Sequence, residues 1–143
     1  MVKLAQQRVA PYAERANIIL TDGSMRFPAA DRSIDRIVST YVFDLLSESD
    51  IDLVISESAR VLSPGGRLCL ASLTSGITFT SKIVSATWSI IYRLHAPLVG
   101  GCRPIQLEAL LVQRNWSIDY RSVITRWGVP SEVLIASPTH APA

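Results

Sequence analysis

Short apolar runs alternate with amphipathic stretches along the first half of the chain, and this alternation restricts the possible fold more than any other feature. The runs are Ile18-Ile19-Leu20, Ile34 to Thr40 and Arg67 to Leu73. We expect each run to be a strand, and we expect Ile18-Ile19-Leu20 to be buried on both faces. Between the last two, Ser47 to Leu62 has a polar N-cap cluster followed by apolar residues at helical spacing. Strands that alternate with helices predict an α/β fold with a mostly parallel sheet.

The second half of the chain predicts a different ending for the sheet. Trp116 to Arg126 and Glu132 to Ala136 are expected strands, and the four residues from Trp127 to Pro130 are a turn between them. A connection this short joins antiparallel neighbours, so the sheet should end in an antiparallel hairpin. Helices are expected at Met1 to Arg15, where Pro11 kinks or ends the helix, at Thr80 to Leu94, and at Pro104 to Asn115. We expect residues 1–143 to form a single domain.

Composition excludes several classes of protein. The formal charge is only +2, and no run of lysine and arginine marks a nucleic-acid-binding surface. The most apolar region, Gly76 to Gly101, is interrupted by charged residues and Pro97, so we expect an amphipathic helix there and no membrane-spanning segment. Cys69 and Cys102 match no metal-ligand spacing, and we predict no metal site. Because no targeting segment is visible, a cytoplasmic location is the default expectation.

Three stretches resemble the small-molecule class I S-adenosylmethionine-dependent methyltransferases, and they are similar to the enzymes of ubiquinone and menaquinone biosynthesis. The third is the most specific, because it is close to the family's "E-x-x-RVLKPGGRL" signature. The stretches are Asp22-Gly23-Ser24 with Phe27-Pro28, Asp31 and Ser33-Ile34-Asp35; the run Ser39 to Leu46; and Glu57 with the run Arg60 to Leu68. The resemblance implies a Rossmann-like methyltransferase fold and S-adenosyl-L-methionine as the cofactor. Within the third stretch, Ser63-Pro64-Gly65-Gly66 is also a folding signal, because it ends a helix and reverses the chain.

The resemblance also assigns cofactor-binding residues. It implies that Asp22 and the backbone amides of Gly23 and Ser24 bind the adenine ring, and that the backbone of Thr40 lies against the methionine part of the cofactor. An isolated Asp-Gly pair is more often only a turn, and that alternative stays open. The acidic residue of the family most often stands one position closer to the proline, at Gly23.

Methyl transfer needs a general base only where the acceptor is protonated, because the sulfonium is itself reactive. The candidate catalytic residues are Tyr41, Asp44 and His95, with Tyr92 beside His95. Asp44 lies just past a strand end, where the active sites of open α/β sheets are found. A solvated or capping role for Asp44 and a structural role for His95 are the simpler alternatives.

The family begins with a strand, a glycine-rich turn, a helix and a second strand that ends in a ribose-binding acid, and none of these precedes Met1. Met1 to Ala5 resembles the "ML-x-x-A" helix that follows them. The family strand order is 3-2-1-4-5-7-6. We therefore expect an N-terminally truncated fold in which the strand Ile34 to Thr40 has a bare edge, and weak or no binding of S-adenosylhomocysteine.

Three hypotheses follow from the sequence. The first is a methyltransferase, or a remnant of one, that acts on a small and possibly apolar acceptor. The second is a non-catalytic module that self-associates or binds a partner chain through its exposed sheet edge. The third is a pseudogene product with no stable fold, which a cooperative thermal melt would exclude.

Overall fold

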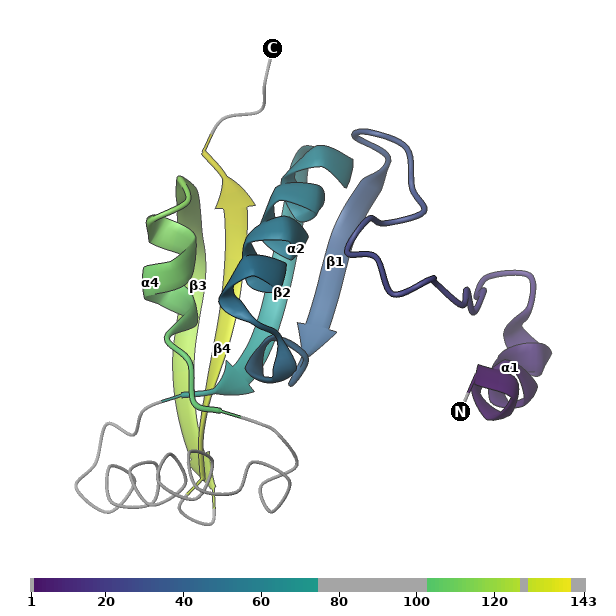
Figure 1. Cartoon of the computed structure of the whole chain (residues 1–143), viewed down its shortest axis with the longest axis horizontal. Coiled ribbons are helices and arrows are strands. Elements are labelled where there is room, and N and C mark those ends of the chain that lie inside the picture. Colours follow the sequence, from purple (N-terminus) through teal and green to yellow (C-terminus); the bar gives the residue numbers. More distant parts are fainter. Residues whose placement is uncertain (1, 75–102, 127–128, 140–143) are drawn as a thin grey trace.

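A computed structural model describes residues 2–74, 103–126 and 129–139 of the chain. Helices and strands follow each other in the order that the alternation predicts (Figure 1). They are α1 Val2–Val9, β1 Ile34–Thr40, α2 Glu48–Val61, β2 Leu62–Leu73, α4 Leu107–Val112, β3 Trp116–Arg126 and β4 Val129–Pro138, with short 3₁₀ turns at Ala10–Tyr12 and Phe43–Leu45. The predicted helix Thr80 to Leu94 and the residues Trp127 and Gly128 lie outside the described residues.

The described strands form one mixed sheet in the order β1-β2-β4-β3. β1 is parallel to β2, with Thr40 opposite Ala71, while β4 is antiparallel to both β2 and β3. The predicted C-terminal hairpin is confirmed, and β3 has the same bounds as the predicted strand. The order β1-β2-β4-β3 corresponds to strands 4-5-7-6 of the family pattern. The α/β Rossmann-like fold is therefore confirmed.

Helix α2 forms where its sequence signals place it. Ser47 is the N-cap, and its hydroxyl accepts a hydrogen bond from the backbone amide of Asp50 at 3.1 Å. The helix ends at Val61, and β2 then begins with a bulge at which Ile34 is opposite Leu62 but Arg36 is opposite Arg67. Gly65 adopts a φ of +79°, which favours glycine.

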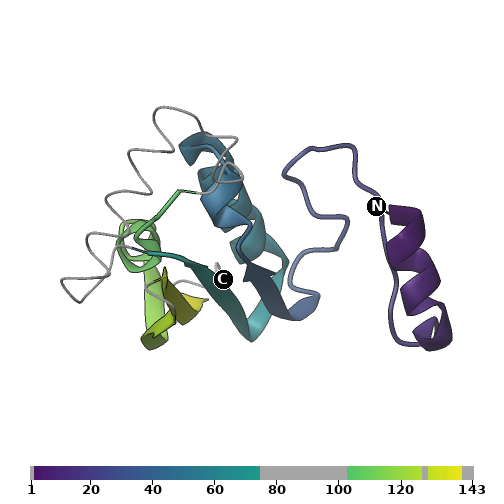
Figure 2. The same cartoon turned by 90° about the horizontal axis from the view of Figure 1, so that it is seen from below.

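One face of the sheet carries the core. Helices α2 and α4 both cover this face, as Figure 2 shows. Each fully buried leucine or isoleucine in such a core contributes about 1.5–3 kcal/mol. The opposite face is open in the described part of the chain, and Val38 of β1 is 70% exposed. The buried core residues are Phe43, Ile51, Ile55, Leu62, Leu68, Leu70, Ile105, Leu107, Leu111, Trp116, Leu134 and Ala136.

The predicted strand at Ile18-Ile19-Leu20 is wrong. These residues are not in a strand, and Leu20 is 74% exposed. The backbone groups of a strand must pair with a neighbour. In the family order the strand of Ile18-Ile19-Leu20 is separated from that of β1 by two others, so β1 is not its partner. In the described structure these three residues pair with no strand, β1 included.

The bounds of two helices and of the last strand also differ from the predictions. The first helix ends at Val9, where a 3₁₀ turn over Ala10–Tyr12 that contains Pro11 follows it, and none of its described residues is buried. The helix predicted from Pro104 begins only at Leu107 and ends at Val112. The last strand starts at Val129, so part of the predicted turn belongs to β4.

Candidate functional site

The loop that leaves the carboxyl end of β1 is fixed to the neighbouring strands by Tyr41. Tyr41 has a φ of +54°, and its backbone amide donates to the carbonyl of Ala71 on β2 at 2.7 Å. Its hydroxyl donates to Oγ of Ser131 on β4 at 3.0 Å. Thr40 and Tyr41 nevertheless stay exposed. This end of the sheet therefore combines a fixed backbone with accessible groups. Open α/β folds bind their ligands at the carboxyl ends of the strands, which is where these residues lie.

Asp44 lies in the next turn of the same loop, and its side chain is buried. It is 1% exposed, and its Oδ2 accepts the backbone N–H of Leu73 at 3.0 Å. Oδ1 has no hydrogen-bond partner among the residues that the structure describes. Burial raises the pKa of Asp44, and the hydrogen bond from Leu73 opposes this only in part. A solvated role is therefore wrong for Asp44, and an anchoring role is supported.

A second set of contacts joins Asp44 to the chain beyond residue 102. The backbone amide of Arg103 donates to the carbonyl of Asp44 at 3.2 Å, and Nη2 of Arg103 donates to the carbonyl of Leu46 at 3.0 Å. The amide of Ile105 donates to the carbonyl of Leu73 at 2.9 Å. The segment that enters α4 is therefore held against the same end of the sheet.

Glu132 is a buried carboxylate on β4 that the sequence reasoning missed. Its Oε2 accepts the backbone N–H of Leu107 at 3.1 Å, and its Oε1 accepts Nε of Arg121 at 2.6 Å. Arg121 also pairs with Glu108 at 3.0 Å, and the Glu132 carboxylate raises the pKa of Arg121. These bonds connect the hairpin to the start of α4. The alternation of apolar residues along β4 carried no signal for this contact.

The turn Asp22-Gly23-Ser24 is formed as the sequence predicts. Oδ1 of Asp22 accepts the backbone N–H of Ser24 at 2.9 Å, and Gly23 has a φ of +87°. Hydrogen bonds from the Ser24 side chain and then from its backbone lower the pKa of Asp22. The carboxylate is exposed and ionised at neutral pH, so it can accept a hydrogen bond from a ligand amine. Among the described residues, no hydrogen bond or ion pair joins this turn to Thr40.

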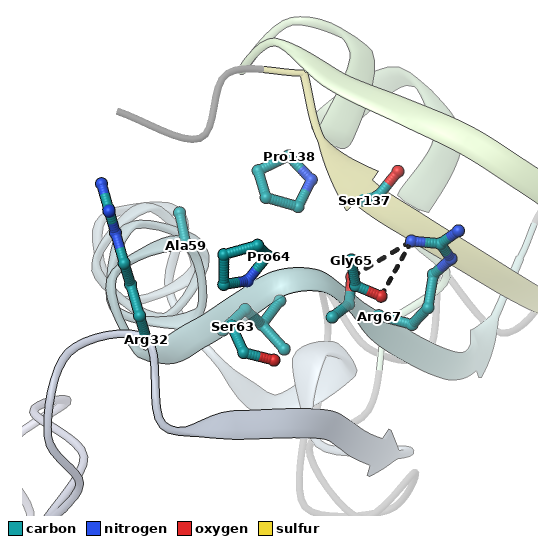
Figure 3. Close-up of a pocket in the computed structure, with 10 residues that line it drawn as sticks. Arg32, Ala59, Ser63, Pro64, Gly65, Arg67, Ser137 and Pro138 are labelled. Atoms are coloured by element: carbon teal, nitrogen blue, oxygen red, sulfur yellow. Dashed lines mark hydrogen bonds between the residues drawn. The ribbon is translucent and has the colours of Figure 1, made fainter. Parts of the chain in front are cut away.

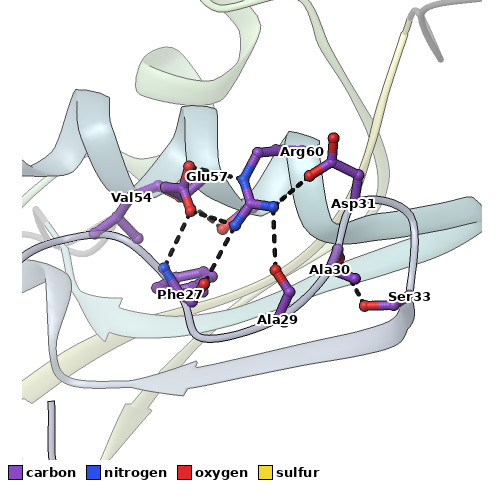
Figure 4. Close-up of polar contacts among 9 residues, drawn as sticks. Phe27, Ala29, Ala30, Asp31, Ser33, Val54, Glu57 and Arg60 are labelled. Carbon is purple, nitrogen blue, oxygen red and sulfur yellow. Dashed lines mark hydrogen bonds and ion pairs between the residues drawn. The ribbon is translucent and has the colours of Figure 1, made fainter.

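The loop after this turn is clamped to α2 by two residues of the "E-x-x-R" string, Glu57 and Arg60 (Figure 4). Glu57 and Arg60 pair side by side, with Nε to Oε1 at 2.9 Å and Nη2 to Oε2 at 2.8 Å. The hydrogen bonds from Arg60 hold the pKa of Glu57 at about 2. The string was recognisable in the sequence as a signature, but its contacts with the loop were not, because they join residues about thirty positions apart.

A pocket of about 230 Å³ lies near the start of β2, at the opposite end of the strand from the loop of Tyr41 and Asp44 (Figure 3). It lies where β2 begins and β4 ends, and Ser63, Pro64, Arg67 and Pro138 are among its lining residues. Because the candidate catalytic residues lie at the carboxyl ends of β1 and β2, this pocket is separate from them.

The remaining predicted site residues are not described. His95 and Tyr92 lie within residues 75–102, so their predicted roles stay predictions. In residues 2–74, 103–126 and 129–139, no cluster of histidine, cysteine and acidic side chains could hold a metal ion. Within the same ranges, no helix has the length and apolar character needed to cross a bilayer.

Comparison with known proteins agrees with this architecture. Residues 1–70 match the family model of the methyltransferase domain. An uncharacterised methyltransferase of Geobacillus kaustophilus is 33% identical over 54 residues, which are 38% of this chain and 25% of that protein.

Two solved structures show the same fold. A Methanosarcina mazei S-adenosylmethionine-dependent methyltransferase has a TM-score of 0.62 and 21% identity, with 92% of this chain and 76% of that chain covered. The magnesium protoporphyrin IX methyltransferase of Synechocystis, solved with bound S-adenosylhomocysteine, has a TM-score of 0.63 and 15% identity, with 96% and 59% covered.

Proposed function

We propose that this chain, whose residues 1–70 match the family model of the methyltransferase domain, is a class I S-adenosylmethionine-dependent methyltransferase that transfers a methyl group to a small, apolar acceptor. The observation that carries the proposal is the end of β1, where the loop is fixed to β2 and β4 while Thr40 and Tyr41 remain exposed. Methyl transfer mainly requires alignment of the acceptor and exclusion of water. A rigid loop with accessible groups suits the first of these tasks.

Two groups of described residues have the chemistry to hold the two ends of S-adenosyl-L-methionine, and we propose that they do so. Asp22 offers an exposed carboxylate with one oxygen occupied by Ser24, so the other oxygen can accept the amino group of adenine. A Cβ at Gly23 would meet nothing within 4 Å, so a ligand can approach the backbone of this turn. The backbone of Thr40 would lie against the methionine end. When bound, the cofactor supplies a methyl group on a sulfonium.

The three proposed catalytic residues divide into different roles. Tyr41 is 47% exposed at the carboxyl end of β1, and we propose that it contacts the acceptor. Asp44 is buried and bound to Leu73, so we assign it a positioning role at the end of β2 and not the role of a base. His95 remains the candidate base where the acceptor carries a proton. The apolar character of the acceptor is proposed from the sequence of Gly76 to Gly101, and the cytoplasm is the proposed compartment.

Titration of the purified chain with S-adenosylhomocysteine in a calorimeter tests the proposal. We expect weak but saturable binding, because Asp22 and Thr40 contact only the two ends of the ligand. Asp22→Ala should weaken it by about tenfold, since a charge-assisted hydrogen bond contributes about 1.5–3 kcal/mol at most. Asp119→Asn, on β3 and outside the cofactor turn, is the matched control and should bind as wild type does. Absence of heat at millimolar ligand, or equal binding by Asp22→Ala, would contradict the proposed cofactor site of this chain.

A second candidate function is supported by β1. It is the end strand of the described sheet, and the exposed Val38 adds an apolar side chain to it. Exposed strand edges pair readily with other chains. A non-catalytic module would self-associate through this strand and would not bind S-adenosylhomocysteine. Analytical ultracentrifugation of wild type and Val38→Lys, which adds a charge to the edge, separates the two candidates.

A further inference from the structure

The loop Phe27 to Ser33 links the cofactor turn to β1, and α2 holds it at both ends. At its start, the amide of Phe27 donates to Oε2 of Glu57 at 3.1 Å. At its end, the amide of Arg32 donates to the carbonyl of Arg60 at 3.0 Å, and that of Ser33 donates to the carbonyl of Val61 at 2.9 Å. The loop is therefore fixed by the last turns of one helix.

The guanidinium of Arg60 makes the central contacts. Nη2 donates to the carbonyl of Phe27 at 3.2 Å, and Nη1 donates to the carbonyl of Ala29 at 3.1 Å and to the carboxylate of Asp31. Arginine suits this task because its planar fork presents several donors in fixed directions, whereas lysine offers one compact charge. The same guanidinium pairs with Glu57, so acceptor atoms from four residues surround one side chain (Figure 4).

The two inner side chains are sheltered from water. Arg60 and Glu57 are 24% and 20% exposed, while Asp31 is 75% exposed. An exposed ion pair contributes little to stability, and its effect is screened by salt. We therefore expect the contacts of Arg60 with Glu57 and with the two carbonyls to fix the loop, and the contact with Asp31 to add less.

We propose that Glu57 and Arg60 are positioning residues for cofactor binding, because they hold the turn Asp22-Gly23-Ser24 in place through the loop that follows it; this inference rests on the proposed function. Three residue steps separate Ser24 from Phe27, and an extended chain spans at most about 3.6 Å per residue. The turn therefore lies within about 11 Å of a fixed point. A site that is ordered before the ligand arrives loses less conformational entropy on binding.

The test compares variants of the full chain in titrations with S-adenosylhomocysteine. Arg60→Gln removes the charge and most of the fork, and we expect its Kd to rise by about tenfold. Arg60→Lys keeps the charge but not the fork, and we expect a rise of about threefold. Asp52→Asn is the matched control. Asp52 lies on the same helix and pairs with Arg114, with no contact to the loop, so its Kd should equal that of wild type.

Amide hydrogen exchange supplies a readout that a general loss of stability would not reproduce. In Arg60→Gln the amides of Phe27, Arg32 and Ser33 should exchange faster, while those of Leu68 and Leu70 in the core strand β2 should be unchanged. Should Arg60→Gln not fold, Arg60→Lys and Glu57→Gln are measured in the same two ways. A released loop with an unchanged Kd would overturn the positioning role and leave the proposed function intact. Absence of binding by wild type would instead overturn the proposed function, and the positioning role with it.

Discussion

Replacing Asp44 by alanine and by asparagine separates the hydrogen bond of its side chain from its charge. In Asp44→Ala the amide of Leu73 loses its acceptor, and an unsatisfied buried donor costs about 1–3 kcal/mol. In Asp44→Asn an amide oxygen remains at the same position and can accept the same bond. We expect the free energy of unfolding of Asp44→Asn to stay within about 0.5 kcal/mol of wild type, or to exceed it.

The pH dependence follows from the direction of the pKa shift. Burial raises the pKa of Asp44, so the folded chain holds this proton more tightly than the unfolded chain does. The stabilisation that protonated Asp44 gives to the folded chain is therefore complete below the pKa of the unfolded chain. It is lost as pH rises through the raised pKa of the folded chain. At neutral pH wild type therefore carries a cost of the buried charge that Asp44→Asn avoids. The advantage of Asp44→Asn should shrink as pH falls toward 4.

Urea unfolding followed by tryptophan fluorescence measures both effects, because Trp116 is buried in the core. With a slope of about 1–3 kcal/mol per molar urea, a loss of about 2 kcal/mol lowers the midpoint by roughly 1 M. The three chains are compared at pH 7.5 and pH 4. If Asp44→Asn were destabilised as much as Asp44→Ala at pH 7.5, the carboxylate charge itself would be required, and the anchoring role would be refuted.

Two further sets of predictions concern the bulge at the start of β2 and the ion pair of Glu57 with Arg60. Gly65→Ala should cost about 1 kcal/mol, because φ is +79° but nothing lies within 4 Å of an added Cβ. Gly66→Ala should cost more, about 1–3 kcal/mol, because its Cβ would lie 2.9 Å from the carbonyl of Ser63; urea midpoints of both variants test the order. The pKa of Glu57 is lowered to about 2, so its stabilising effect should be present above pH 4.5 and lost as pH falls toward 2. In wild type the urea midpoint should therefore fall as pH decreases through this range, and Glu57→Gln should reduce that fall. An equal fall in both chains would contradict the pairing with Arg60.

The elements that the sequence predicted correctly depend on local signals. Ser47 caps α2 with its own side chain, and Gly65, which the sequence placed in a turn, instead lies in the bulged start of β2 with a φ that glycine adopts without strain. The hairpin follows from two apolar runs and a short connection between them. In each case the physical cause lies within a few residues of its effect, so the printed sequence is sufficient.

Features that depend on distant neighbours were not predictable in the same way. The run Ile18-Ile19-Leu20 is as apolar as a buried strand, but apolar character says only that a segment gains by burial. It does not supply a neighbouring strand to accept its backbone hydrogen bonds. The contacts of Glu57 and Arg60 with the loop show the same limit. The spacing of these two residues identifies an ion pair on one helix face, but it does not identify the loop carbonyls that surround the pair.

Asp44 shows how a site residue can be found by position and still be misread in its role. Its place one turn past a strand end is readable from the sequence, and the structure puts it there. Whether a carboxylate at that place is solvated or buried depends on Leu73 and on the segment from Arg103 to Ile105, which are far along the chain. The group that binds Asp44 is the backbone amide of Leu73. Every residue except proline has such an amide, so the residue types of the sequence do not reveal this contact.

The buried carboxylate of Glu132 shows the same dependence on distant residues in the packing of the hairpin. Both faces of β4 are apolar, since Val133 and Ile135 lie on one and Leu134 and Ala136 on the other, so alternation could not choose the inner face. The structure turns Leu134 and Ala136 inward and buries Glu132 with them. A buried carboxylate is costly without donors. A shift of one residue in the pairing of β4 with β2 would move Glu132 to the open face and leave the amide of Leu107 without its acceptor. The two donors to Glu132 therefore help to select the observed register, and with it the hydrogen bond from the hydroxyl of Tyr41 to Ser131.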